Sequence, residues 1–121
     1  MRPDELRSAL AAFTGTADYH HHETASFSYS DGVKFLADEA GAYWLIELIA
    51  SWQKRCRKDR PLRTSQVWEL RVDLETKSGV LVCLRALEDE VFRISLPFTD
   101  FPLAFMRLYL ENEVLMLPGE R

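Results

Sequence analysis

The chain has 121 residues, of which 47% are hydrophobic and 28% are charged, and its formal net charge is −4. This length suits one domain, and seven Phe, four Tyr and three Trp residues exclude a disordered chain. No signal peptide, no apolar run near the roughly 20 residues of a membrane span and no disulfide framework is predicted, so we expect a cytoplasmic protein without membrane contact.

The N-terminal half is predicted to be largely helical. Apolar residues recur at helical spacing over residues 6–13, and the polar residues 14–28 predict a loop that leads into a short strand. Helical spacing returns from 31 to about 57, with a bend expected at Gly41. The part at 42–52 is apolar on nearly every side, which is typical of a central core helix or of a helix that buries a spare face against a partner.

Alternating apolar and polar residues predict an antiparallel meander of three strands over residues 66–98. Turn-forming or charged residues at 76–79 and 88–90 separate these strands. We expect charged residues such as Glu69 to face water on the first strand. The residues expected to point inward are Trp68, Leu70, Val72, Leu74, Phe92, Ile94, Leu96 and Phe98.

Two phrases are near copies, Tyr29-Ser30-Asp31-Gly32 and Phe98-Thr99-Asp100-Phe101. Ser, Thr and Asp oxygens accept the free N–H groups of a helix's first turn, so Ser30, Asp31, Thr99 and Asp100 are predicted to be structural caps. The second phrase would open a brief helix, with Pro102 in its first turn.

The end of the chain allows two interpretations. Residues 103–112 alternate in a way that favours a C-terminal hairpin, although one longer helix through Asn112 is a competing interpretation. With the hairpin, the predicted fold class is a single α+β domain over residues 1–121. Two or three helices would pack on one face of an antiparallel sheet made of the meander and this hairpin.

Six of the fifteen Lys and Arg residues lie within positions 54–63, which hold one acid, Asp59. These six residues are Lys54, Arg55, Arg57, Lys58, Arg60 and Arg63, and Trp52 lies just before them. The preferred interpretation is that these cations end a helix, where they favour its dipole and stay solvated. The alternative is a binding surface for phosphates or acidic partners, including nucleic acid, with Trp52 as a stacking residue.

The only histidines are His20, His21 and His22, and Glu23 follows them. In an extended segment His20 and His22 share one side while His21 points away, so the three imidazoles do not converge on one metal ion. We therefore expect no metal and no cofactor, and we interpret the run as a solvated or partner-facing loop.

Three further residue types are weighed as catalytic groups. Glu47 stands among apolar residues, where desolvation would raise the pKa of its carboxyl group and suit it to act as a general acid. The preferred interpretation is a side chain that faces solvent or forms an ion pair. The alternatives are the catalytic role and a buried polar anchor in an interface. Cys56 lies among cations that lower the pKa of a thiol, yet no orienting base is near it, so we expect an incidental surface thiol. Cys83 is expected in the core. Asp31 and Asp100 could form a carboxylate pair, but capping explains both, and no catalytic residue is predicted.

Six phrases span nearly the whole chain: Phe13-Thr14-Gly15-Thr16, Ser30-Asp31-Gly32-Val33, Gly41-Ala42-Tyr43-Trp44-Leu45, Gln66 with Trp68 and Leu70, Thr99-Asp100-Phe101-Pro102-Leu103, and Leu115 to Glu120. In this order they resemble a family of small bacterial proteins that has no assigned activity. The resemblance implies a bacterial origin, near plasmid, phage or other mobile genes, and it brings no catalytic residues. The chain departs from the family at Ser30, where threonine is usual, and in its histidine run and its basic segment.

Three hypotheses for the function remain. The preferred hypothesis is a non-enzymatic protein-interaction or regulatory module with a protein partner or a second copy of itself, because helix 42–52 is so apolar and the charge is so uneven. The first alternative is a nucleic-acid-binding protein that uses residues 54–63. The second is a small enzyme that uses Glu47, a histidine or Cys56.

Overall fold

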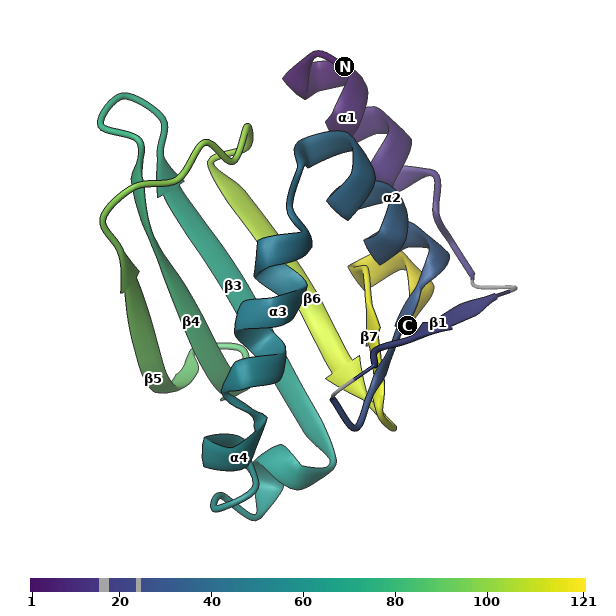
Figure 1. The fold of residues 1–121 in the computed structure, drawn as a ribbon, viewed down its shortest axis with the longest axis vertical. Helices are drawn as coiled ribbons and strands as arrows, with labels where there is room; N and C mark the ends of the chain where they lie inside the picture. The colour runs from purple at the N-terminus through teal and green to yellow at the C-terminus, as the bar shows by residue number, and fades with distance from the viewer. Residues whose placement is uncertain (16–17, 24) are drawn as a thin grey trace.

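The computed structural model describes residues 1–15, 18–23 and 25–121 (Figure 1). Thr16, which closes the first of the six phrases, and two other residues of the predicted loop 14–28 lie outside the described residues. The described residues form the helices α1 (Pro3–Ala11), α2 (Asp31–Ala40), α3 (Tyr43–Ser51) and α4 (Gln53–Cys56), with short 3-10 turns at η1 (Pro61–Arg63) and η2 (Pro118–Glu120). They also form the strands β1 (Tyr19–His21), β2 (Ser28–Ser30), β3 (Ser65–Asp73), β4 (Ser78–Ala86), β5 (Asp89–Leu96), β6 (Phe105–Glu111) and β7 (Val114–Met116).

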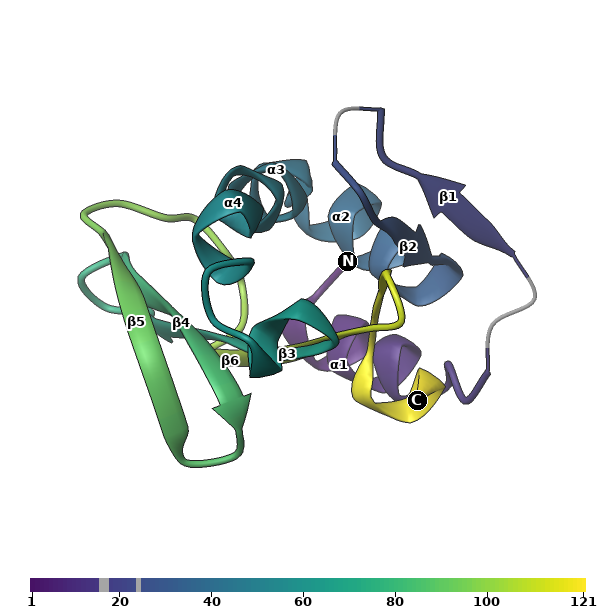
Figure 2. The same cartoon turned by 90° about the horizontal axis from the view of Figure 1, so that it is seen from below.

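The seven strands of the described chain build one sheet in the order β1-β2-β7-β6-β3-β4-β5. Neighbouring strands are antiparallel except β2 and β7, which are parallel. Helices α2, α3 and α4 lie over one face of the sheet, and α1 packs against α2 (Figure 2). The predicted α+β class, the meander and the C-terminal hairpin are confirmed. The sheet is larger than predicted, and it is mixed because β2 and β7 run in the same direction.

The main hydrophobic core lies between these helices and the sheet. Its fully buried side chains include Leu6, Leu36, Leu45, Ile49, Leu62, Trp68, Leu70, Leu81, Leu108 and Leu115. Burial of each such side chain contributes roughly 1.5–3 kcal/mol. The alternation of β3 therefore determines its orientation, with Trp68 and Leu70 under the helices.

A smaller cluster is buried on the face of the sheet that α2, α3 and α4 do not cover, and it consists of Val67, Val82, Leu84 and Tyr109. Glu69 lies on this face as well, but the prediction that it would face water is wrong, because its side chain is only 6% exposed. Burial raises the pKa of its carboxyl group. Hydrogen bonds from Arg71 and Arg107 outweigh that effect, so the pKa lies below its usual range.

The start of α2 explains the phrase Ser30-Asp31-Gly32. The Ser30 hydroxyl accepts a hydrogen bond from the Val33 N–H at 3.2 Å, as an N-cap should. It also donates to the Glu120 carboxylate, which accepts the N–H groups of Gly32 at 3.1 Å and Leu117 at 2.9 Å. A Cβ on Gly32 would lie 2.6 Å from a Glu120 oxygen, so any larger residue here would have to displace the Glu120 carboxylate. Capping by Ser30 is confirmed, but Asp31 is the first helical residue rather than a cap.

The long helix predicted from 31 to 57 is divided into three. Gly41 ends α2 in the left-handed conformation, with φ of 59°, and Trp52 separates α3 from α4. The apolar side chains of α3 pack on the core, including the partly buried Trp44 and Leu48. Helix 42–52 is thus a core helix, on which Tyr43 remains 42% exposed.

The helix predicted after Thr99 and Asp100 does not form. Residues 99–104 run as an irregular connection in which the Thr99 hydroxyl accepts the Phe101 N–H at 3.2 Å, so Thr99 stabilises a turn. Asp100 caps no helix among the described residues. The connection is held at both ends, because the Thr99 N–H donates to the Lys77 carbonyl and the Val72 N–H donates to the Ala104 carbonyl, each at 2.8 Å. These bonds, together with buried Phe101, keep the segment from coiling into a helix.

Two residues that were expected to point inward are exposed instead. Phe98 is 71% exposed and Leu74 is 51% exposed. Each lies beyond the end of its strand, because β5 ends at Leu96 and β3 ends at Asp73. The side-chain alternation of a strand does not extend past its last residue.

The hairpin of β6 and β7 turns at Asn112 and Glu113, which have φ of 51° and 64°. This is the geometry of a two-residue type I′ turn, and it excludes the competing helix through Asn112. The edge strand β1 lies inside the predicted loop 14–28, and the prediction of a loop there is wrong for Tyr19–His21.

Candidate functional site

The six cations of segment 54–63 lie on α4, on the turn after it and on η1, at the bottom of Figure 1. All six of these residues are exposed. We call this group the basic surface, and it consists of Lys54, Arg55, Arg57, Lys58, Arg60 and Arg63. The predicted grouping of these side chains on solvent-facing structure is therefore present.

Ion pairing separates the basic surface from the other cations of the protein. Outside it, seven of the nine Lys and Arg residues form salt bridges with carboxylates, namely Arg7, Lys34, Arg71, Arg85, Arg93, Arg107 and Arg121. Among the described residues, no side chain of the basic surface forms a salt bridge with a carboxylate. Asp59, the one acid in the segment, is paired with Arg85 of β4, and the hydrogen bonds from Arg85 lower the pKa of its carboxyl group. The positive charge of the surface is thus left open to solvent.

Local contacts fix part of the basic surface. The Arg57 guanidinium donates to the Ser26 hydroxyl, and Arg63 Nε donates to the Arg57 carbonyl at 2.7 Å. Both arginines line a hollow of about 70 Å³ together with Thr64. The Arg55 guanidinium lies 5.3 Å from the centre of the Phe92 ring. The side chains of Lys54, Lys58 and Arg60 form no hydrogen bond or ion pair with the described residues. A surface of exposed cations of this kind suits an anionic partner surface.

Trp52 does not serve the basic surface as a stacking residue. Its ring packs on Phe92 with a centroid distance of 5.1 Å, and the residue is partly buried against the core. A base would have to displace this contact in order to stack there. The predicted role of Trp52 in nucleic-acid binding therefore has no support in this geometry.

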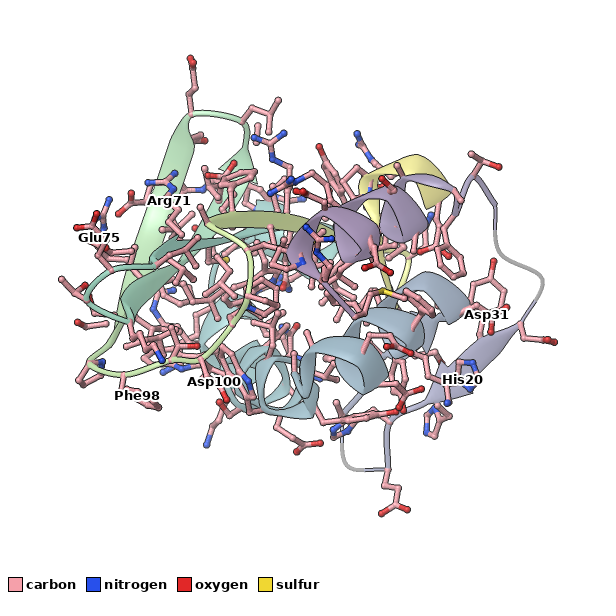
Figure 3. All side chains as sticks on the ribbon, turned by 90° about the horizontal axis from the view of Figure 1, so that it is seen from above. His20, Asp31, Arg71, Glu75, Phe98 and Asp100 are labelled. Carbon is pink, nitrogen blue, oxygen red and sulfur yellow. The ribbon has the colours of Figure 1, made fainter. Side chains whose placement is uncertain are left out.

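The histidines attach the β1–β2 hairpin to the helices. His20 Nε2 lies 2.9 Å from Asp31 Oδ1 at the start of α2 (Figure 3). His22 Nε2 lies 2.6 Å from Glu47 Oε1 on α3. His21 is exposed, as the alternation predicted. His22 is buried, so the predicted solvated loop is wrong for this residue.

The pair of His22 and Glu47 has a defined arrangement of protons. His22 Nδ1 accepts the Ala25 N–H at 2.9 Å, so in the neutral ring the proton is on Nε2 and is donated to Glu47. Both ring nitrogens of His22 are thereby engaged in structural contacts. The Glu47 side chain is 67% exposed, which agrees with the predicted solvent-facing position.

Cys56 and Cys83 are both fully buried, and both belong to the main core. The prediction of a surface thiol is wrong for Cys56, because α4 turns this residue inward while its charged neighbours point outward. A hydrogen bond between the two thiols raises the pKa of Cys83, and burial adds to the effect. No substrate in solution can reach either sulfur while α4 is in place.

Asp31 and Asp100 lie at opposite ends of the molecule, so they form no carboxylate pair (Figure 3). Among the described residues, no group of three or more His, Cys, Asp or Glu side chains could hold a metal ion. In the same part of the chain, no helix has the length and apolar character needed to cross a membrane.

An apolar groove that sequence reasoning missed lies between α1 and the beginning of β6. It has a volume of about 440 Å³, and its lining includes Leu10, Ala11, Leu103, Met106 and Pro118. One signal in the sequence could have indicated it. Pro118 must end β7 early, because proline has no N–H for a sheet, and β6 is therefore longer than its neighbour.

Three of the six phrases meet in the structure, since Glu120 of the last phrase accepts hydrogen bonds from Ser30 and Gly32 of the second. A Cβ on Gly119 would lie 2.5 Å from the Phe13 carbonyl oxygen, which places the first and last phrases in contact. Gln66 accepts the Trp68 indole N–H at 2.9 Å and exchanges hydrogen bonds with Gln53. No curated protein and no solved structure matches the chain. The model of a family of unknown function, DUF6876, matches residues 4–121, and the chain belongs to this family.

Proposed function

We propose that this protein is a non-enzymatic binding module that docks an acidic protein partner through the basic surface. The observation that carries this proposal is the contrast in ion pairing. Most cations elsewhere are neutralised within the fold, whereas the six cations of 54–63 have no carboxylate partner among the described residues. A carboxylate-rich surface would supply the missing partners.

The rest of the chain favours a protein over a nucleic acid. Outside the basic surface the chain is strongly acidic, since its net charge is −4 with these six cations included. A long polyanion that reaches past the basic surface would meet this acidic body and be repelled. A protein partner can place a compact acidic face against the cations and a neutral or basic rim against the remainder.

A photo-crosslinking residue at position 60 tests the proposal in cells that carry the gene naturally. Arg60 is exposed and forms no side-chain hydrogen bond or ion pair with the described residues. The same crosslinking residue at position 2 is the control, because Arg2 is also exposed and forms no salt bridge within the part of the chain that the structure describes. We expect a nuclease-resistant adduct with one protein from position 60 and none from position 2.

The purified partner then has to bind through the cations. The variant Lys54→Glu, Lys58→Glu and Arg60→Glu should bind it roughly 10–100-fold more weakly in a calorimetric titration, and added salt should weaken binding by the wild type. The matched control reverses the two cations elsewhere that form no salt bridge with the described residues, Arg2→Glu and Lys77→Glu, and should bind like the wild type. An adduct that nuclease removes, or equal binding by both variants, would overturn the proposal.

A further inference from the structure

A second site, independent of the basic surface, lies where β7 leaves part of β6 without a neighbour. β7 pairs with Tyr109–Glu111, whereas β6 begins at Phe105. Beyond β7 the chain turns away at Pro118 into η2. About four residues of β6 therefore present an open strand edge, roughly 13 Å long at 3.4 Å per residue.

The register determines which backbone groups point into this gap. The Ala104 carbonyl accepts the Val72 N–H, so the even-numbered residues of β6 direct their backbone groups toward β3. Phe105 and Arg107 direct theirs to the other side, where Tyr109 pairs with β7. Within the part of the chain that the structure describes, the N–H and C=O groups of Phe105 and Arg107 on that side have no backbone partner.

The apolar groove adjoins the beginning of this open edge, where Phe105 and Met106 line it. α1 forms its far wall with Leu10 and Ala11, and Met106 and Leu117 provide further apolar surface. Arg7 is the only charged residue among those that line the groove, and its side chain is 65% exposed, with Asp4 at 3.3 Å as its salt-bridge partner. Apolar walls beside free backbone groups are the combination that binds peptides by strand addition.

We propose that this groove binds an extended segment of another protein, which adds a strand to β6 in line with β7. The segment would continue an interface that already exists, because β7 occupies the remainder of the same edge. Its backbone pairs with Phe105 and Arg107, and alternate apolar side chains enter the groove. A carboxylate on the segment, from an acidic side chain or a free C-terminus, lies near Arg7.

A random dodecapeptide phage library, selected against the full-length protein, provides the probe. The matched counter-selection uses Ala11→Trp, because Ala11 is exposed at the end of α1 and a tryptophan there fills the groove without entering the core. We expect apolar peptides that carry an acidic residue and bind the wild type at least tenfold more tightly than Ala11→Trp. The absence of any peptide that distinguishes the two proteins would overturn the proposal.

A proline substitution distinguishes strand addition from simple apolar contact. Phe105→Pro removes an N–H group that points into the groove and leaves the hydrogen bonds between β6 and β3 intact. Phe105→Val removes the same aromatic ring but keeps the N–H group. We expect the selected peptides to lose at least tenfold in affinity for Phe105→Pro relative to Phe105→Val.

A measurement on the wild-type protein makes the result independent of how the proline variant folds. In an added strand every second N–H group of the peptide faces β6. N-methylation of these N–H groups in a selected peptide should abolish binding, and N-methylation of the alternate set, which faces away, should leave binding unchanged. Equal binding by the two methylated peptides would overturn strand addition. A helical bound peptide in NMR spectra would do the same.

Discussion

Two polar regions of the molecule differ in how their groups are paired. In the contact between the start of α2 and η2, which we call the seam, the Glu120 carboxylate accepts hydrogen bonds from Ser30, Gly32 and Leu117. On the basic surface, no cation has a carboxylate partner among the described residues. The seam joins parts of the second and last of the six phrases, whereas the basic surface lies outside these phrases. Polar groups that are paired with one another stabilise the fold, while the cations of the basic surface leave their charge exposed to solvent.

The largest loss of stability is expected for Glu120→Ala. It removes the acceptor for the Ser30 hydroxyl and for two backbone N–H groups, and Ser30 is fully buried. Donors left without a partner cost roughly 1–3 kcal/mol each when they are buried, so we expect the free energy of unfolding in urea to fall by about 2–4 kcal/mol. Glu120→Gln keeps an oxygen acceptor and should lose about half as much. A loss below about 1 kcal/mol for Glu120→Ala would show that the seam does not hold the fold together.

A second test concerns cations that are paired within the fold. Arg71 and Arg107 both form salt bridges with Glu69. The pKa of Glu69 is lower in the folded protein than in the unfolded chain, so its stabilisation is fully present above the ordinary value of about 4.3 and is lost as the pH falls through the folded-state pKa. Glu69→Gln should lower the free energy of unfolding by about 1–3 kcal/mol at pH 7. The difference from the wild type should shrink toward pH 3, and urea titrations at several pH values measure it. A difference that does not change with pH would contradict the role of this carboxylate.

The spacing of apolar residues predicted the helices and strands that bury one face against the core. It failed where contacts between residues distant in sequence determine the local structure. The meander and the C-terminal hairpin follow from alternation and turn residues, which are local. The irregular segment after Thr99 resembles a helix start in sequence, but bonds to Lys77 and Val72 hold it extended. β1 is too short to show a pattern, and it forms only because β2 lies beside it.

The site was only partly visible in the sequence, for a similar reason. Composition located the six cations of the basic surface, but pairing depends on where the carboxylates lie in space. Asp59 adjoins these cations in sequence, yet it pairs with Arg85 of β4, which is distant in sequence. The groove beside β6 depends on the different lengths of two strands, and no single segment shows that difference.

Cys56 lies where the two regions meet, because its neighbours in sequence belong to the basic surface while its own side chain is in the core. Cys56→Ala removes a buried sulfur and its hydrogen bond with Cys83, so the free energy of unfolding should fall by about 1–2 kcal/mol. In the folded wild type, a thiol reagent should modify Cys56 at least 100-fold more slowly than in urea, because both sulfurs are buried. Rapid labelling of the native protein would place Cys56 at the surface and contradict this assignment.

The smallest effect on stability is expected at the basic surface. The triple variant Lys54→Glu, Lys58→Glu and Arg60→Glu breaks no ion pair found among the described residues, and all three side chains are exposed. The free energy of unfolding should therefore stay within about 0.5 kcal/mol of the wild type, and it should rise slightly at low salt, because repulsion among neighbouring cations is relieved. Arg121→Glu is the control, because Arg121 forms a salt bridge with Glu111 at 3.0 Å. This variant should lose more stability than the triple variant. If the triple variant instead lost more stability than Arg121→Glu, the open cations would be part of the fold, and their availability to a partner would no longer follow.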